Sequence, residues 1–281
     1  MKFKDYIWPV IGILAVIVSA WLLYRELRSI SLEDVLDSLY AIRAHHWLLA
    51  TAAALLAYSS LAGYDRIALL HLRRKISWLF IALCSFTTYA LSHNIGASVV
   101  SGAVVRYRAY SSQGMPGSEI AVLIAFCSFT FILGVIITSS IVLLLEPHIL
   151  MRFNSDLTPT VSIVITLLML AFVLLYIFGS WLQLRPLQIG KFRLEYPRLP
   201  VVTQQLIVAP LELIGAAGII YFALPEAGNP GFLIILGIFL VSFSAALISH
   251  APGGLGVLEL VFLTGLPDMD PAAVLAALAV F

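Results

Sequence analysis

The chain has 281 residues, of which 61% are hydrophobic and 11% are charged, and its formal net charge is +1. Soluble domains carry about 25% charged residues, so this composition excludes a soluble globular protein and indicates an integral membrane protein. A net charge so close to zero says nothing about partners. The two cysteines, Cys84 and Cys127, lie inside apolar runs, and we interpret them as small buried hydrophobic residues without a disulfide or metal role.

The N-terminal part begins with an apolar run over residues 6–24 that resembles a signal peptide. No convincing cleavage site leads into a soluble mature sequence, so we interpret the run as an uncleaved first span. Residues 25–46 follow with helical spacing and with Ser31 and Asp34 as a capping pair, which predicts a short amphipathic helix in the membrane interface. A plain connecting loop is the alternative.

The rest of the chain is a succession of apolar runs separated by short polar loops. Further spans are predicted over residues 47–64, 118–145, 160–184, 203–224 and 232–248. A last run over residues 271–281 has about half the length that a span requires, so we expect the sequence to be truncated at its C-terminus.

Two apolar segments, at about 76–105 and 231–266, are interrupted by similar stretches that read SHNIG and SHAPGGLG. An uninterrupted helix satisfies its backbone inside a bilayer, so breaks of this kind are expected only where protein or a wet cavity surrounds them. Thirty helical residues extend about 45 Å, which is too short to cross a core of about 30 Å twice. Each segment is therefore predicted to be a re-entrant hairpin.

The basic residues in the loops predict from which side of the membrane each hairpin enters. The loops 66–75 and 185–198 hold four Lys or Arg each, which favours the cytoplasmic side for both. The first hairpin then enters from the cytoplasm and the second from the outer face, as in an inverted-topology repeat whose breaks meet at a midplane substrate site. The predicted fold is an all-α polytopic membrane protein with about six spanning helices and two hairpins. It forms a single transmembrane domain over residues 1–281, with the N-terminus in the cytoplasm.

The hairpin tips supply the first candidates for binding. His93 and His250 are ionisable groups that a membrane tolerates mainly at cavities, although each could instead satisfy backbone groups freed by the break. Glycines after His250 allow a tight turn and a close approach of amide groups to an anion such as lipid phosphate; a packing turn is the alternative.

Charged residues outside the tips add further candidates. Arg106 and Arg108 flank Tyr107 at the expected cytoplasmic end of the first hairpin, where they would dock a phosphate headgroup or serve as a positive-inside anchor. Glu212 and Glu259 are acids within apolar runs, and Glu259 would meet His250, a cationic headgroup or the helix dipole. Asp65 and Arg66 are interpreted as an interfacial ion pair.

The candidate substrate-binding residues are Ser92, His93, Asn94, Gly96, Arg106, Tyr107, Arg108, Ser249, His250, Pro252, Gly253, Gly254, Gly256 and Glu259. Secondary candidates are Asp65, Arg66, Gln205 and Glu212. No nucleophile elbow, P-loop, metalloprotease motif or acidic metal cluster is visible, so no catalytic residue, metal or cofactor is expected.

The stretches SHNIGASVVSGAVVRYRAYSSQG, AFCSFTFILG and ISHAPGGLGVLE resemble the transmembrane region of the lysylphosphatidylglycerol synthase/flippase family, also called the multiple peptide resistance factor family. GYDRIALL and the pattern from Gln205 to Glu212 fit the same region. The resemblance implies a flippase region that moves aminoacylated phosphatidylglycerol to the outer leaflet and contributes to antimicrobial peptide resistance. This sequence holds no soluble domain of the kind that makes this lipid in the family, so the synthase activity is not carried over; we expect either a stand-alone relative or a chain cut short before a catalytic half.

We therefore expect a lipid translocase of the bacterial inner membrane, acting on (aminoacyl-)phosphatidylglycerol and binding no nucleic acid. A homodimer or association with a lipid-modifying enzyme is left open. Three alternatives remain: a solute or ion-coupled transporter, the membrane half of a lysylphosphatidylglycerol synthase, and a partner subunit that transports nothing.

Overall fold

The computed structural model describes residues 31–95, 98–183, 187–189, 192–194, 196–249 and 254–281, and within them it omits the side chains of 92–101, 187–189 and 192–194. The predicted span over residues 6–24 lies outside the described part. The first helix of the described part, α2 (Leu32–Tyr40), starts with the predicted capping box. Ser31 Oγ accepts a hydrogen bond from the Asp34 amide, and the Asp34 carboxylate accepts one from the Ser31 amide. The helix in this segment is thus confirmed.

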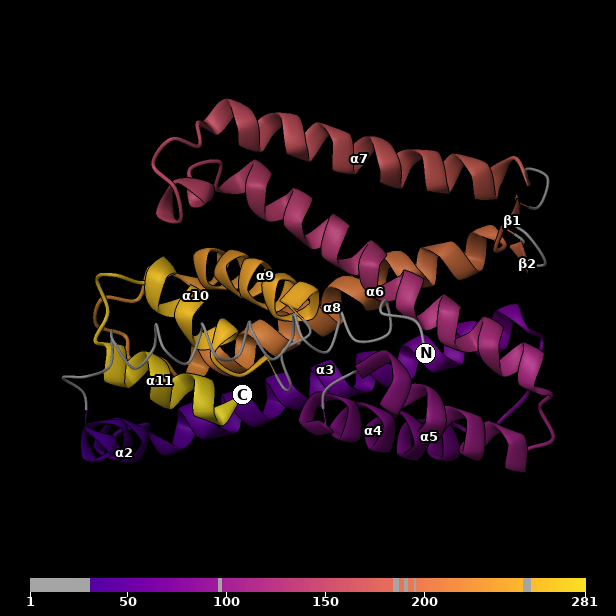
Figure 1. Cartoon of the computed structure of the whole chain (residues 1–281), viewed down its shortest axis with the longest axis horizontal. Coiled ribbons are helices and arrows are strands. Elements are labelled where there is room, and N and C mark those ends of the chain that lie inside the picture. The colour runs from indigo at the N-terminus through magenta and orange to yellow at the C-terminus, as the bar shows by residue number, and fades with distance from the viewer. Residues whose placement is uncertain (1–30, 96–97, 184–186, 190–191, 195, 250–253) are drawn as a thin grey trace, which may run out of the picture.

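Two long antiparallel helices, α3 (Ala44–His71) and α8 (Leu199–Ala223), form the centre of the molecule (Figure 1). A Cβ on Gly215 of α8 would lie 2.7 Å from the amide nitrogen of Ala57 and 2.8 Å from the carbonyl oxygen of Ala53. Small residues at the contact therefore let the two backbones approach closely, as in other membrane helix pairs. At the other end of the contact, Tyr64 of α3 reaches the α8 backbone.

A helix pair follows each of these central helices. After α3 come α4 (Trp78–Ile95) and α5 (Ser98–Ser112), which pack on each other, and after α8 come α9 (Phe232–Ser249) and α10 (Val257–Gly265), which do the same. In Figure 1 the first pair occupies one half of the long axis and the second pair the other half.

Each pair leaves and returns at the same end of the molecule. Arg74, which precedes α4, forms an ion pair with Glu119, which follows α5, at a shortest N···O distance of 2.7 Å. Gly228, before α9, lies against the carbonyl of Asp268, after α10. Because α3 and α8 are antiparallel, the two ends are opposite, and the two helix pairs enter the molecule from opposite sides.

The remaining elements enclose this arrangement. Helix α6 (Gly117–Leu145) runs alongside α8 and continues through the 3-10 helix η2 (Ile149–Arg152) into α7 (Pro159–Trp181). A short antiparallel hairpin of β1 (Leu187–Ile189) and β2 (Phe192–Leu194) joins α7 to α8, with Gln188 opposite Arg193. These two strands are a small exception to the all-helical prediction. Helix α11 (Pro271–Val280) packs on α2 and α8.

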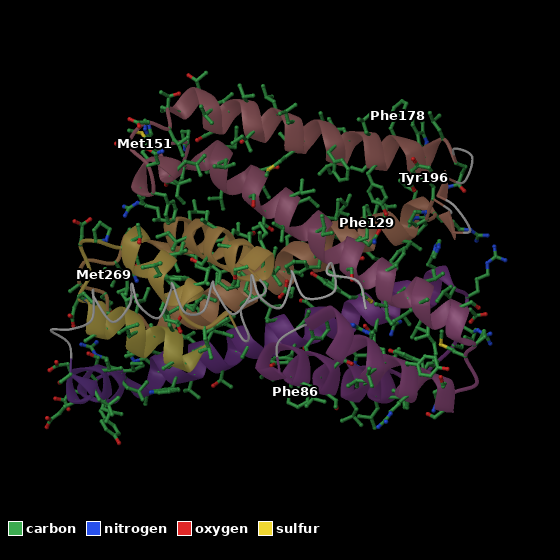
Figure 2. The ribbon with its side chains drawn as sticks, viewed as in Figure 1. Phe86, Phe129, Met151, Phe178, Tyr196 and Met269 are labelled. Carbon is green, nitrogen blue, oxygen red and sulfur yellow. The ribbon has the colours of Figure 1, made fainter. Side chains whose placement is uncertain are left out.

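Within the described residues, five helices are long and apolar enough to cross a membrane: α3, α6, α7, α8 and α9. Large apolar side chains cover the outside of the bundle; Phe86 on α4 and Phe178 on α7 point outward at opposite edges of Figure 2, and both are more than half exposed. Such a surface is stable only in lipid. The protein is a multi-pass membrane protein, as its composition predicts.

Two predicted boundaries differ from the structure. The span over residues 47–64 was expected to end before the charge of Asp65, but α3 continues to His71 because Asp65 is fully buried and paired. The first hairpin was expected to end at 105, but α5 continues to Ser112 for the same reason, since it carries the partner of Asp65.

The close contact between α3 and α8 makes Gly215 sensitive to added bulk. Replacing it in Gly215→Val is expected to lower the free energy of unfolding by about 1–3 kcal/mol, because the new side chain meets backbone atoms that cannot move aside. Thermal or denaturant unfolding in detergent micelles measures the change. Ala52→Val adds bulk on the exposed face of α3 and should be nearly neutral; equal losses in both variants would contradict the close contact.

Candidate functional site

The most prominent polar feature of the described membrane region is an ion pair between α3 and α5. Arg106 donates hydrogen bonds to Asp65 from Nη2 at 2.7 Å and from Nε at 3.1 Å. Asp65 is fully buried and Arg106 is 6% exposed. An unpaired charge in the interior of a membrane protein is costly, so each residue stabilises the other, and together they fix α5 against α3.

Three more side chains complete this group, which we call the Asp65 network. The Tyr110 hydroxyl donates to Asp65 Oδ2 at 2.8 Å, and Cys127 Sγ of α6 lies 3.3 Å from Asp65 Oδ1. The guanidinium of Arg106 sits over the ring of Tyr89 of α4, 5.0 Å from its centroid, in a cation–π contact. The carboxylate thus has partners on α5 and α6 and, through Arg106, on α4.

A second polar group surrounds Glu212 on the neighbouring face of α3. The Tyr64 hydroxyl lies 3.3 Å from the Ala209 carbonyl and 3.5 Å from Glu212 Oε2. Pro210, next to Ala209, has no amide hydrogen and so leaves α8 with one backbone hydrogen bond fewer at this point. Tyr64 and Asp65 are consecutive on α3, so the two groups are adjacent.

Nearer the start of α8, Gln205 is fully buried between α6 and α7. It accepts a hydrogen bond from the Tyr176 hydroxyl at 2.6 Å and donates one to Thr130 Oγ1 at 2.7 Å. Both ends of the amide are satisfied, which is the condition for burying it without a large cost. This contact holds α6, α7 and α8 together.

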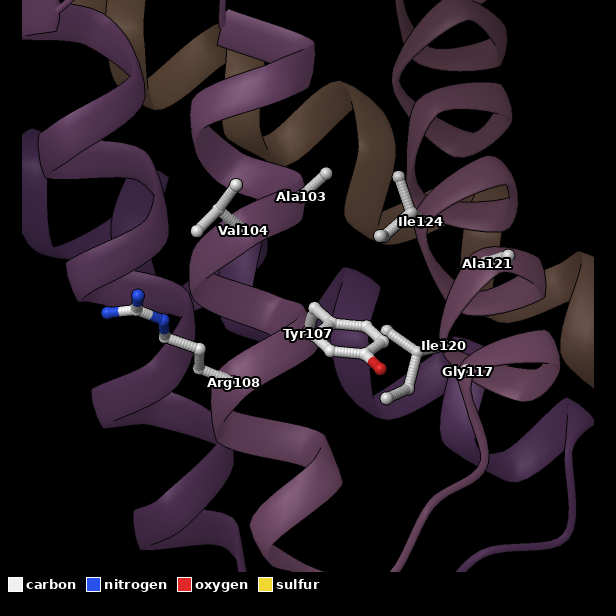
Figure 3. A pocket seen from close by; sticks show the side chains of 8 residues that line it. All are labelled: Ala103, Val104, Tyr107, Arg108, Gly117, Ile120, Ala121 and Ile124. Atoms are coloured by element: carbon white, nitrogen blue, oxygen red, sulfur yellow. The ribbon is translucent and has the colours of Figure 1, made fainter.

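An outward-facing groove of about 340 Å³ lies between α5 and α6 (Figure 3). The Tyr107 ring projects from α5 toward Ile120 and Gly117 of α6, and Arg108 extends from α5 in another direction. The residues that line the groove are Ala103, Val104, Tyr107, Arg108, Gly117, Ile120, Ala121 and Ile124. Apart from Arg108 and the Tyr107 hydroxyl, this lining is apolar, and it suits an acyl chain better than a polar solute.

The structure brings together some of the predicted residues and separates others. Asp65 pairs with Arg106, not with Arg66, so the predicted Asp65–Arg66 ion pair is wrong; the Arg66 guanidinium instead lies over the Trp78 ring at 5.5 Å. Arg106 is buried within the bundle rather than exposed at a hairpin end, because α5 extends beyond it. Arg108, two residues later on the helix, points to the exposed surface.

The described part of the second break behaves as a turn. Gly254 and Gly256 have φ angles of +71° and +81°, which L-residues with side chains rarely adopt. Glu259 accepts a hydrogen bond from the Gly256 amide at 2.7 Å at the start of α10, which is the helix-terminal role considered for it. Ser249 donates to the Ala246 carbonyl at 2.9 Å within α9.

Several predicted residues cannot be placed as side chains. Ser92, His93 and Asn94 lie in the last turn of α4, which ends at Ile95, so the helix continues farther into the break than expected. Their side chains lie outside the described part. Gly96, His250, Pro252 and Gly253 are outside the described residues altogether.

Sequence reasoning missed the partners that make these sites. Tyr110 follows Arg106 by four residues, the spacing that places two side chains on one helical face. That spacing was the available signal. No comparable signal in the sequence pointed to Tyr64, Tyr89 or Tyr176, because an aromatic residue in an apolar run is usually interpreted as a packing residue. Cys127 is buried as predicted, and its thiol also contacts Asp65.

Comparison with known proteins identifies the family. Residues 12–281 match the family described as the lysylphosphatidylglycerol synthase TM region. The chain belongs to this family. An uncharacterized protein of Synechocystis sp. is 31% identical over 275 residues, which are 96% of this chain and 84% of that protein. The family resemblance expected from the two hairpin motifs is confirmed.

Two further relatives are less similar to this chain. The inner membrane protein YbhN of Escherichia coli is 28% identical over 222 residues, 77% of this chain and 67% of YbhN. A phosphatidylglycerol lysyltransferase of Staphylococcus haemolyticus is 24% identical over 271 residues, 96% of this chain but 30% of the enzyme. The chain thus spans less than a third of that lysyltransferase.

The Asp65–Arg106 pair leads to a test of stability. Asp65→Leu or Arg106→Met alone is expected to lower the free energy of unfolding by about 3–5 kcal/mol, because an unpaired charge stays buried. The double variant should recover most of this loss. Unfolding curves in detergent measure both effects. Arg74→Gln/Glu119→Gln removes a more exposed pair and should cost at most about 1 kcal/mol; a double variant as unstable as the singles would contradict the pairing.

Proposed function

We propose that the protein is a lipid translocase that moves phosphatidylglycerol-type lipid, including aminoacylated forms, across the bacterial inner membrane. The supporting observation is the pair of broken helix hairpins that enter the bundle from opposite ends. In transporters such pairs bring their breaks together near the midplane and form the substrate site. Family membership and the named activity of the Staphylococcus haemolyticus relative support an aminoacylated phospholipid as substrate. The similarity to YbhN, an inner membrane protein, supports the inner membrane as the location.

The proposed path begins at the groove between α5 and α6. Tyr107 and Arg108 receive the phosphate at the cytoplasmic end, and the acyl chain follows the apolar lining, so the lipid enters sideways from the bilayer. The headgroup then passes to the two tips, Ser92–Gly96 and Ser249–Gly256. There His93 and His250 contact the phosphate or its substituents, and Glu259 meets the amine of an aminoacyl group.

The Asp65 network supplies a further step. Arg106 holds a carboxylate with two nitrogen donors, and guanidinium binds phosphate in the same bidentate manner. We infer that a lipid phosphate can replace Asp65 as the partner of Arg106 while the first hairpin moves. Glu212, which contacts Tyr64, is adjacent to this network. In this proposal the N-terminus is cytoplasmic and no cofactor takes part.

The direct test is headgroup transfer in proteoliposomes with labelled phosphatidylglycerol and its lysyl form. Wild-type protein is expected to transfer at least one of them, and His93→Ala/His250→Ala should reduce the rate about tenfold or more, the effect of losing a charge-assisted hydrogen bond of about 1.5–3 kcal/mol. His45→Ala, an exposed histidine at the start of α3, serves as the control. No transfer of either lipid by folded protein would contradict the proposal.

A solute transporter would share the hairpins but have no use for a groove that opens to lipid. Ala121→Trp fills the groove from α6 and is expected to slow lipid transfer several-fold with little change in stability. Ala125→Trp, one turn later on the same helix and also exposed, does not line the groove and should transfer normally. Transfer unaffected by Ala121→Trp would remove the groove from the path, and uptake of an ionic solute without lipid transfer would favour the transporter.

A further inference from the structure

A second cavity, of about 180 Å³, lies where α3 ends and α4 begins. It belongs neither to the Asp65 network nor to the α5–α6 groove. Its lining residues are Arg66, Leu69, Leu70, Arg74, Lys75, Ile76 and Ile81. Three of these seven side chains are cationic, whereas only 16 of all 281 residues are Lys or Arg, so positive charge is concentrated here.

Two of the three cations are held in place by neighbours. The Arg66 guanidinium lies 5.5 Å from the centroid of the Trp78 ring. Arg74 donates two hydrogen bonds to Glu119, from Nε at 2.7 Å and from Nη2 at 2.8 Å. Ordered side chains lose less entropy when they bind a ligand. The cavity is thus partly organised before any ligand arrives.

Within the described residues, carboxylates do not balance the positive charge at this cavity. Glu119 is the partner of Arg74, and no ion pair of the described residues involves Arg66 or Lys75. Three positive charges against one negative charge leave a net charge of two. An anion at the cavity would therefore gain attraction from two cations that have no carboxylate partner in the described chain.

The remaining wall of the cavity is apolar. Leu69 and Ile81 are almost fully buried beneath the cavity, and Leu70 is 45% exposed beside it. Trp78 is 46% exposed next to Arg66, and tryptophan favours the level of the lipid headgroups. A ligand at this position meets cations on one side and hydrocarbon on the other.

We propose that this cavity binds the phosphate of an anionic bilayer phospholipid, with its glycerol and upper acyl carbons on Leu69, Leu70 and Ile81. A free inorganic anion would leave the apolar wall unused, and a zwitterionic lipid would bring no net charge. Basic pockets beside membrane helices recognise anionic headgroups in this way. The site is a resident-lipid site that anchors the junction of α3 and the first hairpin, and it stands independently of the translocase proposal.

The test uses phosphatidylglycerol and phosphatidylcholine probes that carry the same photoactivatable acyl chain, with full-length protein in nanodiscs. Mass spectrometry then locates the labelled peptides. The phosphatidylglycerol probe is expected to label residues 66–81 preferentially, and Arg66→Gln/Lys75→Gln should reduce this labelling about tenfold or more, since each removed cation weakens binding of anionic lipid. Arg73→Gln/Arg198→Gln removes two exposed cations that do not line the cavity and should label like wild type.

A second variant tests the cavity without changing charge. Ile76→Trp fills it and should also reduce labelling, whereas Leu79→Trp, which is exposed and does not line the cavity, should leave it unchanged. The proposal is overturned if both lipids label equally, if the control pair loses as much labelling as Arg66→Gln/Lys75→Gln, or if wild-type residues 66–81 are not labelled. The labelling experiment measures binding and not transport. If wild-type protein is labelled as expected but transfers neither lipid in proteoliposomes, that result counts against the translocase proposal alone.

Discussion

The ion pair between Asp65 and Arg106 is the constraint on which the described arrangement of the first helix pair depends. Neither residue is stable without a partner: a lone carboxylate or guanidinium inside a lipid-embedded bundle costs several kcal/mol. The two residues of the pair are 41 positions apart in sequence, and Tyr110 and Cys127 add bonds from α5 and α6. A charge that a membrane would normally exclude thus links α3 to α5, a helix that otherwise packs mainly on α4.

Close packing supplies the second constraint. Gly215 lets α8 contact α3, and a Cβ on Gly134 of α6 would lie 2.9 Å from the carbonyl oxygen of Ala209. Hydrophobic transfer gives no preference between lipid and a neighbouring helix, so contacts of this kind must hold the bundle together. Because α3 and α8 are antiparallel, each sends its following helix pair in from a different end, and the opposed geometry follows from one contact.

The sequence predicted the helices and their paired segments better than it predicted which buried side chains contact one another. Apolar runs, glycine-containing breaks and loop charges were enough to find the long helices and the two paired segments, because these depend on local composition and on the length of a bilayer-spanning helix. Loop charge cannot distinguish a cation at the membrane surface from one that is neutralised inside, so Arg106 was assigned to the surface. Its partner lies 41 positions earlier, and no local pattern connects the two. The position of Asp65 and Arg66 at the end of an apolar run likewise predicts an interfacial ion pair, because sequence gives no sign that Asp65 has a distant partner.

The same ion pair limits how the first hairpin can move. Rocking of α4 and α5 against α3 would separate Arg106 from Asp65, and both charges would then be buried without partners unless something replaced the missing contact. A lipid phosphate carries the charge and the two acceptor oxygens that Arg106 loses. Water could hydrate the Asp65 carboxylate only if the movement admitted solvent to the site. The Tyr110 hydroxyl, which donates to Asp65, lies on α5 and would move away with that helix. In the proposed translocation, movement of the first hairpin is therefore coupled to the arrival of an anionic headgroup, because separating Arg106 from Asp65 without one leaves a buried charge unpaired.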